Sequence, residues 1–332
     1  MAIENNLPLV LITHALPEYW LVTLKERVHA VIGPLDATFL TLELEVHLAE
    51  AEGLFCVLTI PVRKELLERM PRLRVVSNMA GGVDNIDVAE CTRRGIPVGN
   101  TPGVLTDATA DLTMALLLSA ARRLSEAASD ARQGRWKTWS PTGWLGADFS
   151  GATLGIIGMG KIGRAVAKRA RGFGMRIIYH DPAASPYGGY EKILFDDLLL
   201  QSDFVSLHCP LTAETKGLIN ERALRKMKAT AILVNAARGL VVDTNALVRA
   251  LKEGWIAGAA LDVTDPEPLP PKHPLYSLTN CLVVPHIGSA TRGTRKRMVE
   301  IACENLLAGL EGHKLPYCVN PEVYCQIRRG SL

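Results

Sequence analysis

The chain has 332 residues, of which 48% are hydrophobic and 21% are charged, so it can form two globular domains of ordinary size. Its 37 basic and 34 acidic residues give a formal net charge of +3, which indicates neither a nucleic-acid nor a membrane partner. The seven cysteines contain no CxxC pair, which argues against a disulfide scaffold or a metal site and favours the cytoplasm. No secretion signal is evident in residues 1–6, and the longest apolar helical stretch, 112–121, is too short to span a bilayer.

The N-terminal part of the chain alternates strand and helix patterns. Buried strands are predicted at 9–13, 54–59 and 73–77, with a helix at 64–70 and a short closing strand at 97–99. Strands that alternate with helices are typical of a parallel sheet with helices on its faces. We therefore expect an α/β fold, with ligands bound beyond the carboxyl ends of its strands.

Three segments link this part to the middle of the chain. A loop of small residues at 78–85 follows the third strand, and a long helix is predicted at 107–123. The next stretch, 136–146, is rich in Trp, Pro and Gly, and we expect it to be irregular.

The middle of the chain carries a dinucleotide fingerprint, in which an apolar strand at 153–157 runs directly into a glycine-rich turn. Gly158 permits the tight turn, Gly160 lets the backbone approach a pyrophosphate, and Gly163 lets the following helix pack closely on the strand. The free N–H groups at the start of that helix favour phosphate charge. The residues predicted to hold the cofactor at this turn are Gly158, Met159, Gly160, Lys161, Ile162 and Gly163.

Two later segments extend the predicted nucleotide site. A second strand ends at Asp181, whose carboxylate can accept hydrogen bonds from the adenosine ribose hydroxyls. Another strand leads to His208, Cys209 and Pro210, which we interpret as the wall of the adenine pocket. With the glycine turn, these segments predict a nucleotide-binding domain.

The late strands end in polar residues that an apolar pattern does not require. These strands are predicted at 204–207, 231–235, 257–261 and 282–284, and a long helix follows at 292–310. The polar residues after the last three are Arg238, Glu267 and His286. If the sheet is parallel, these side chains converge at the edge that carries the cofactor.

The chemistry of these three side chains suits the reduction of a 2-keto acid. An arginine offers a planar fork that matches a carboxylate, so Arg238 would bind the substrate and polarise its carbonyl. A histidine can donate a proton near neutral pH, so His286 would protonate the carbonyl oxygen as hydride arrives at carbon. A carboxylate beside a histidine favours its charged form and fixes its orientation, which is the role predicted for Glu267.

In order along the chain, these motifs resemble those of the D-isomer-specific 2-hydroxyacid dehydrogenases, over nearly the whole sequence. Within that family the chain looks most similar to the glyoxylate/hydroxypyruvate reductases, which reduce small 2-keto acids with a nicotinamide cofactor. The segments that carry the resemblance are 81–87, 100–102, 106–111, 154–163, 235–239, 261–270 and 285–291.

The resemblance implies further roles for residues of this chain. The loop of Ala80, Gly81 and Gly82 matches the one whose backbone N–H groups hold the substrate carboxylate. Thr109 matches a threonine that contacts the cofactor, and Asp262 matches the acidic residue that holds the nicotinamide carboxamide. Arg238, Glu267 and His286 match the catalytic residues. Cofactor contacts are also implied for Ala236, Arg238, His286 and Gly288.

Trp139 resembles a tryptophan that reaches the active site of a neighbouring subunit in these reductases. The alternative is that it anchors a dimer interface without touching substrate. Either role implies a homodimer.

The resemblance also implies how the chain divides into domains. A Rossmann nucleotide domain, residues 104–290, would be inserted into a discontinuous, flavodoxin-like substrate domain formed by 1–103 and 291–332. Both domains would be doubly wound parallel α/β sheets. The long helices near 107–123 and 291–311 would then cross between them.

Asp181 departs from the pattern of several glyoxylate/hydroxypyruvate reductases, which prefer NADPH and carry a small residue followed by Arg. A carboxylate at this position would repel a 2′-phosphate. NADH is therefore the predicted cofactor, with NADPH as the alternative.

Other interpretations stay open. A D-lactate-type or short phosphoglycerate-type dehydrogenase would share these motifs, as would an NAD-sensing binding protein similar to transcriptional corepressors. Glu267 argues against a formate dehydrogenase, which has glutamine there. The 80–82 loop lacks the lysine of phosphite dehydrogenases.

Overall fold

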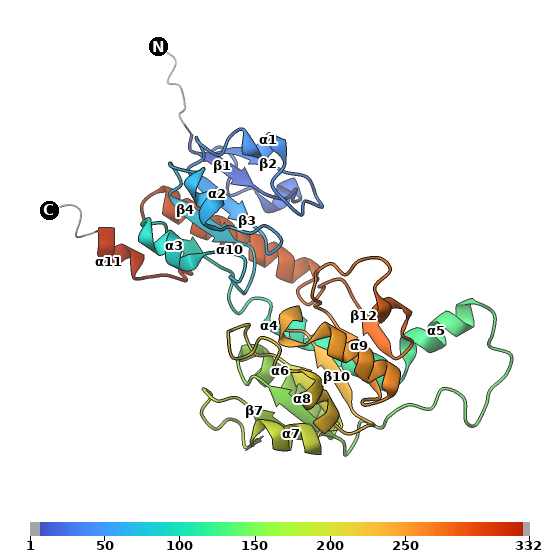
Figure 1. Ribbon diagram of the computed structural model, residues 1–332. Coiled ribbons are helices and arrows are strands. Elements are labelled where there is room, and N and C mark those ends of the chain that lie inside the picture. The colour runs from blue at the N-terminus through green and yellow to red at the C-terminus, as the bar shows by residue number, and fades with distance from the viewer. Residues whose placement is uncertain (1–6, 328–332) are drawn as a thin grey trace, which may run out of the picture. The chain divides into compact units, whose positions relative to one another are not determined.

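The computed structural model describes residues 7–327, which form two compact units (Figure 1). Unit 1 combines Met1–Leu105 with Thr291–Leu332, and unit 2 is Thr106–Ala290. Residues 1–6 and 328–332, which belong to the predicted substrate domain, lie outside the described residues. Each unit is built on a parallel sheet with helices on both faces, which confirms the predicted fold class.

The sheet of unit 1 has five parallel strands in the order β2-β1-β3-β4-β5, which is the flavodoxin-like order. The strands are β1 (Leu9–Ile12), β2 (His29–Ile32), β3 (Gly53–Cys56), β4 (Val75–Asn78) and β5 (Val98–Gly99). The helices described in this unit are η1 (Glu18–Trp20), α1 (Leu42–Glu45), α2 (Lys64–Glu68), α3 (Val88–Arg93), α10 (Arg292–Leu310) and α11 (Val323–Ile327).

Successive side chains of a strand point to opposite faces of the sheet, so those of unit 1 pack into two cores, one on each face. Val10 and Phe55 pack on one face against Ala302 and Leu306 of α10. On the other face, Leu11, Leu54 and Val76 pack with buried residues of α1, α2 and α3. A C-terminal helix therefore closes a core made of N-terminal strands, so unit 1 is discontinuous in sequence.

The sheet of unit 2 has seven parallel strands in the order β12-β11-β10-β9-β6-β7-β8. The first strand, β6, lies inside the sheet and the order reverses there, as in a Rossmann fold. The strands are β6 (Thr153–Ile157), β7 (Arg176–His180), β8 (Glu191–Lys192), β9 (Phe204–Leu207), β10 (Ile232–Asn235), β11 (Gly258–Leu261) and β12 (Cys281–Val283). The helices are α4 (Thr106–Ala121), α5 (Leu124–Arg132), α6 (Lys161–Gly172), α7 (Phe195–Gln201), α8 (Glu221–Lys226), α9 (Thr244–Glu253), η2 (Gly239–Val241) and η3 (Pro274–Ser277).

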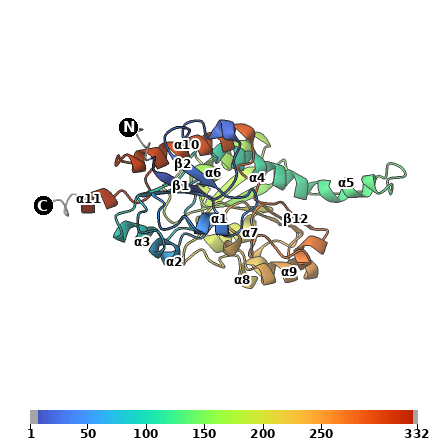
Figure 2. The same cartoon turned by 90° about the horizontal axis from the view of Figure 1, so that it is seen from above.

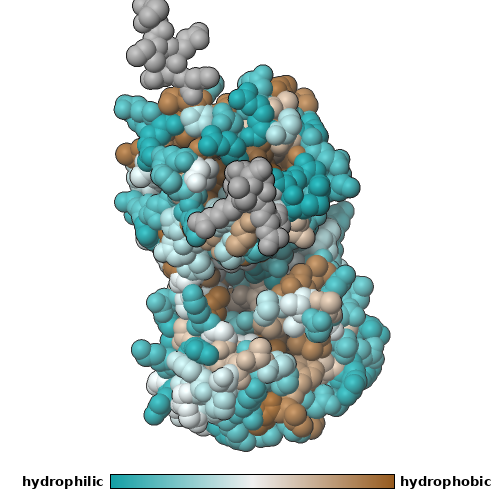
Figure 3. Space-filling model, turned by 90° about the vertical axis from the view of Figure 1, so that its left-hand side faces the viewer, coloured by the Kyte–Doolittle hydropathy of each residue, from teal (hydrophilic) through white to brown (hydrophobic). Residues whose placement is uncertain are grey.

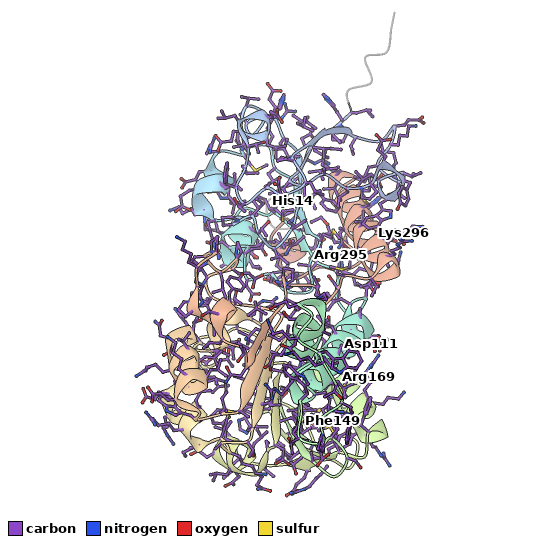
Figure 4. The ribbon with its side chains drawn as sticks, turned by 90° about the vertical axis from the view of Figure 1, so that its right-hand side faces the viewer. His14, Asp111, Phe149, Arg169, Arg295 and Lys296 are labelled. Atoms are coloured by element: carbon purple, nitrogen blue, oxygen red, sulfur yellow. The ribbon has the colours of Figure 1, made fainter. Side chains whose placement is uncertain are left out.

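Two layers of helices cover this sheet. Residues of α4 and α6 share a buried core with one face, and residues of α7, α8 and α9 share a core with the other. Arg169 of α6 joins the two helices of the first layer, because it contacts Asp111 of α4 at 2.6 Å (Figure 4). It also contacts Asp107 of α4 at 3.0 Å. Phe149 packs against Phe204 of β9, with ring centroids 5.0 Å apart and the rings tilted by 58°.

α5 and the irregular segment after it extend away from the sheet of unit 2 (Figures 1 and 2). The base of this arm is fixed, because Ala147 N donates to Ala121 O at 2.9 Å and Arg123 stacks over the ring of Trp144. Its outer side chains, Trp136 and Trp139, are exposed. We use the name arm for residues 124–146.

Hydrophilic residues cover most of the face shown in Figure 3, and hydrophobic residues appear there in small groups. Within residues 7–327, no helix has both the length and the apolar character needed to cross a bilayer.

Candidate active site

The glycine turn between β6 and α6 has the geometry that a pyrophosphate requires. Gly158 has a φ of +95°, and a Cβ there would lie 2.5 Å from the backbone N of Cys209. A Cβ on Gly163 would lie 2.1 Å from the carbonyl oxygen of Gly158, so only glycine lets α6 start this close to the turn. At Gly160, the N-cap of α6, a Cβ would meet nothing within 4 Å. Open space at the N-terminus of a helix fits a dinucleotide phosphate.

Asp181 follows β7, and backbone N–H groups hold its carboxylate beside the glycine turn. Oδ2 accepts a hydrogen bond from Met159 N at 2.8 Å, and Oδ1 accepts from the N–H groups of Ala183 and Ala184, each at 3.0 Å. A carboxylate oxygen can accept two hydrogen bonds, so Oδ2 keeps capacity for a ribose hydroxyl.

The turn after β9 packs against the glycine turn with uncharged side chains. Burial lowers the pKa of His208 to about 3, and burial raises the pKa of the Cys209 thiol to about 11. His208 Nε2 lies 2.8 Å from Ser206 Oγ, whereas its Nδ1 is buried without a hydrogen-bond partner among the described residues. Pro210 follows at the surface. A neutral wall of this kind suits an adenine ring.

Asn235, the last residue of β10, shapes the turn that carries Arg238. It is almost fully buried; its Nδ2 donates to Arg238 O at 2.9 Å, and its Oδ1 accepts from Ala237 N at 3.0 Å. Arg238 Nη1 also donates to Ala237 O at 2.7 Å. The sequence motifs assign no role to Asn235, although a polar residue at the end of an apolar strand is the signal that marks it. Ala236 is buried within this turn.

Asp262, just after β11, fixes the turn that carries His286. Its carboxylate accepts hydrogen bonds from Ile287 N at 2.6 Å and Gly288 N at 2.9 Å, and its carbonyl oxygen accepts from His286 N at 2.9 Å. His286 has a φ of +50°, a left-handed conformation that residues with a Cβ rarely adopt. Burial raises the pKa of Asp262, against the opposing effect of these N–H donors. Asp262 therefore fixes the backbone of the histidine turn. This contact is separate from the nicotinamide contact predicted for the same residue.

Glu267 and His286 form the central pair of the site. Glu267 Oε1 lies 2.5 Å from His286 Nδ1, and Glu267 Oε2 accepts from Thr264 N at 3.1 Å. Burial raises the pKa of Glu267, but the bond to His286, the Thr264 N–H and the positive charges of His286 and Arg238 together bring it below its ordinary value. Within the described residues, Nε2 of His286 has no hydrogen-bond partner, so it is available to a substrate.

Thr109 of α4 reaches the same region of unit 2. It is buried, and a Cβ built on Gly288 would lie 3.4 Å from its Oγ1 and 2.9 Å from Asp262 Oδ2. The carboxyl ends of β6, β7, β9, β10, β11 and β12 thus bring the predicted cofactor and catalytic residues of unit 2 to one edge of the sheet.

The remaining predicted site residues lie elsewhere. Ala80, Gly81 and Gly82 follow β4 of unit 1, and we call these three residues the β4 loop. Trp139 lies in the arm with 79% of its surface exposed. No cluster of three or more His, Cys, Asp or Glu side chains able to hold a metal ion occurs in the described part of the chain.

The chain shares its nucleotide-binding half with a known enzyme family. Residues 114–288, just over half of the chain, match the NAD-binding domain of the D-isomer-specific 2-hydroxyacid dehydrogenases. The chain belongs to this family. The protein is therefore an NAD(P)-dependent oxidoreductase of the 2-hydroxyacid dehydrogenase type, as the sequence motifs predicted.

Individual relatives resemble the dehydrogenase over nearly its whole length. The glyoxylate reductase of Thermococcus kodakarensis is 50% identical over 324 residues, which cover 95% of this chain and 97% of the relative. A crystal structure of a Thermus thermophilus protein has a TM-score of 0.89 and 49% identity, covering 94% of this chain and 99% of that one. An NADPH-dependent glyoxylate/hydroxypyruvate reductase from Sinorhizobium meliloti, in complex with NADP and malonate, has a TM-score of 0.81 and 32% identity, with coverage of 94% and 96%.

Proposed function

We propose that the dehydrogenase reduces glyoxylate to glycolate and hydroxypyruvate to D-glycerate, with NADH as the hydride donor. The names of the Thermococcus and Sinorhizobium relatives support this substrate class. The observation that carries the proposal is the Glu267–His286 pair, which holds an acid/base group within the electrostatic reach of Arg238.

The three residues have separate roles in the proposed reaction. A bound nicotinamide supplies the hydride that adds to the keto carbon. Nε2 of His286 donates a proton to the keto oxygen, because Nδ1 is held by Glu267, and the C=O bond becomes a C–O single bond with new C–H and O–H bonds. His286 then regains its proton from solvent. Glu267, ionised at neutral pH, stabilises the charged histidine, and Arg238 binds the substrate carboxylate.

The β4 loop would bind the same carboxylate through its backbone N–H groups. We accordingly assign the substrate role to a domain of residues 1–103 and 291–332, and the nucleotide role to residues 104–290. The five-stranded and seven-stranded sheets, in flavodoxin-like and Rossmann order, support this division.

NADH is the preferred cofactor in this proposal because of Asp181. Three backbone N–H groups hold its carboxylate next to the glycine turn, where the adenosine ribose of a dinucleotide binds. A ribose hydroxyl can donate to this carboxylate, whereas a 2′-phosphate would be repelled by it.

The exposed aromatic side chains of the arm support a homodimer. Trp136 and Trp139 are 74% and 79% exposed, and large aromatic side chains of this kind typically anchor interfaces. In this proposal a second copy of the chain covers the arm, and Trp139 approaches the partner's substrate. Sedimentation at the mass of two 36.1 kDa chains is the expected result, and a monomer would contradict it.

The test of the acid/base role is the variant His286→Ala. Turnover of hydroxypyruvate with NADH should fall about 100- to 10,000-fold, which is the usual contribution of a general acid. The dissociation constant of NADH, measured by its fluorescence, should change less than about threefold, because the dinucleotide contacts lie mainly at the glycine turn.

The matched control is His313→Ala, which removes an exposed histidine of unit 1 and should leave turnover unchanged. Unchanged turnover in His286→Ala would remove this residue from the acid/base role. Loss of NADH binding in parallel with turnover would instead make it a structural residue.

A further inference from the structure

Two residues that follow β5, Asn100 and Thr101, donate hydrogen bonds to the first two carbonyl oxygens of the β4 loop. Ala80 O accepts a hydrogen bond from Thr101 N at 2.9 Å, and Gly81 O accepts from Asn100 Nδ2 at 2.8 Å. Asn100 is itself fixed, because its carbonyl oxygen accepts at 3.0 Å from Nδ2 of Asn305, a fully buried residue of α10. Helix α10 therefore braces this side of the loop.

A pair of asparagines holds the third carbonyl oxygen. Nδ2 of Asn78, fully buried at the end of β4, donates to Gly82 O at 3.0 Å and to Asn85 Oδ1 at 3.1 Å. Asn85 Nδ2 donates in turn to Val57 O at 3.2 Å and Ile60 O at 3.0 Å. These bonds join the β4 loop to the segment that follows β3.

The held carbonyl groups determine where the N–H groups point. The peptide bonds of the loop are trans, so each carbonyl oxygen and the N–H that follows it lie on opposite sides of the chain. The N–H groups of Gly81, Gly82 and Val83 therefore point away from the groups that hold the carbonyls. None of the three donates to an acceptor in the described residues. Successive free N–H groups of this kind form a site for an anionic oxygen.

We propose that Asn78 and Asn100 are positioning residues, which aim the N–H groups of Gly81, Gly82 and Val83 at the carboxylate of the 2-keto acid. This inference rests on the proposed function, in which that loop binds the substrate. If either amide is removed, a loop carbonyl loses its donor and its peptide unit is free to rotate. Loss of either amide should weaken substrate binding and leave kcat nearly unchanged. The reason is that the N–H groups contact the carboxylate equally in the bound substrate and in the transition state, while hydride adds to the neighbouring carbon.

The experiment uses the full chain with the variants Asn78→Ala and Asn100→Ala. The KM for glyoxylate should rise about tenfold in each, the effect of one hydrogen bond to a charged group, with kcat within about twofold of the original. The inhibition constant of oxamate, a carboxylate that is not reduced, should rise by the same factor. The dissociation constant of NADH should stay unchanged.

The control is Asn320→Ala. Asn320 is a fully buried asparagine of the same unit, with hydrogen bonds to Val98 N of β5 at 2.8 Å, to Ile96 O at 3.1 Å and to Thr92 Oγ1 of α3 at 2.8 Å. Its loss should lower the melting temperature and leave the KM for glyoxylate unchanged. An equal rise of KM in Asn320→Ala would show a general effect of destabilisation and overturn the inference.

Asn100 is only half-buried, so Asn100→Ala decides the question even if Asn78→Ala does not fold. Unchanged KM and oxamate inhibition in folded variants would overturn the inference and leave the proposed function standing. A full-length protein that reduces no 2-keto acid would instead overturn the proposed function itself.

Discussion

Two acidic residues fix the imidazole of His286, one through its side chain and the other through its backbone. Glu267 accepts at Nδ1, which leaves Nε2 without a partner among the described residues, and in the proposed reaction Glu267 stabilises the charged ring. Asp262 acts on the backbone, because it accepts from the N–H groups of residues 286–288 and so supports a φ of +50° at the histidine. At the residue scale, these contacts therefore set the direction of the proposed proton donor before any substrate binds.

The variant Glu267→Gln tests the ionic part of this arrangement. The pKa of Glu267 is lowered in the folded protein, so its carboxylate contributes stability that is present above the pKa of an unfolded glutamate, about 4.3. That contribution is lost as the pH falls through the lowered pKa. Between about pH 6 and pH 3, the melting temperature of the original protein should therefore fall more than that of Glu267→Gln.

Turnover at neutral pH should also fall in Glu267→Gln, because a neutral amide does not stabilise the charged histidine. Differential scanning calorimetry across the pH range and steady-state rates measure the two effects. Parallel melting curves with full activity would contradict the ion-pair interpretation.

Residues of the candidate site could be proposed from sequence where a polar side chain interrupts an apolar pattern at a strand end, as with Arg238 and His286, which the fold brings to the same edge of the sheet. Asn235 was missed, and so was the contact of Asp262 with the histidine turn. Their partners are backbone groups, and in the case of Asp262 these lie more than 20 residues away in the sequence. Such a contact depends on β11 and β12 being neighbours, which only the folded sheet provides.

At the scale of elements, apolar runs located most of the strands because parallel strands are buried on both faces. β2 was missed: it is a short edge strand that starts at His29 and has only three apolar residues, and its residues are exposed or half-buried. The helix predicted at 107–123 ends instead at Ala121, and α5 begins after Arg123, which adopts a left-handed conformation with φ +52°. No periodic signal marks that break.

Gly309 shows how closely α10 packs on the sheet of unit 1. A Cβ at this position would lie 2.5 Å from Cβ of Val75 on β4. Glycine to alanine inside a helix ordinarily stabilises by about 1 kcal/mol, but a clash with a strand side chain costs about 1–3 kcal/mol. We expect Gly309→Ala to lower the free energy of unfolding, because Val75 is buried and cannot move aside.

Gly293 in the first turn of the same helix is the matched control, because a Cβ there meets nothing within 4 Å. Gly293→Ala should leave the stability unchanged or raise it by up to about 1 kcal/mol. Urea unfolding of both variants measures the difference. Equal stabilisation by the two substitutions would show that α10 does not pack tightly on β4.

At the scale of the whole molecule, unit 1 is completed by a helix from the far end of the chain. Periodicity alone could predict α10 as a helix, but not the sheet it covers, because Leu306 and Val10 are distant in sequence and meet only in the folded core. The two-domain division came from the family resemblance. The dehydrogenase class follows from the same resemblance and from the family match. Substrate choice depends on residues beyond the catalytic set, so it needs a direct assay.

The proposed reaction is the reduction of short 2-keto acids with NADH. Initial rates of NADH and NADPH oxidation, at limiting cofactor, should be compared for glyoxylate, hydroxypyruvate, pyruvate and a bulkier 2-keto acid. We predict the highest kcat/KM for glyoxylate or hydroxypyruvate, and a preference of about tenfold or more for NADH, because Asp181 would repel a 2′-phosphate. Activity confined to bulky 2-keto acids, or a large preference for NADPH, would contradict the account.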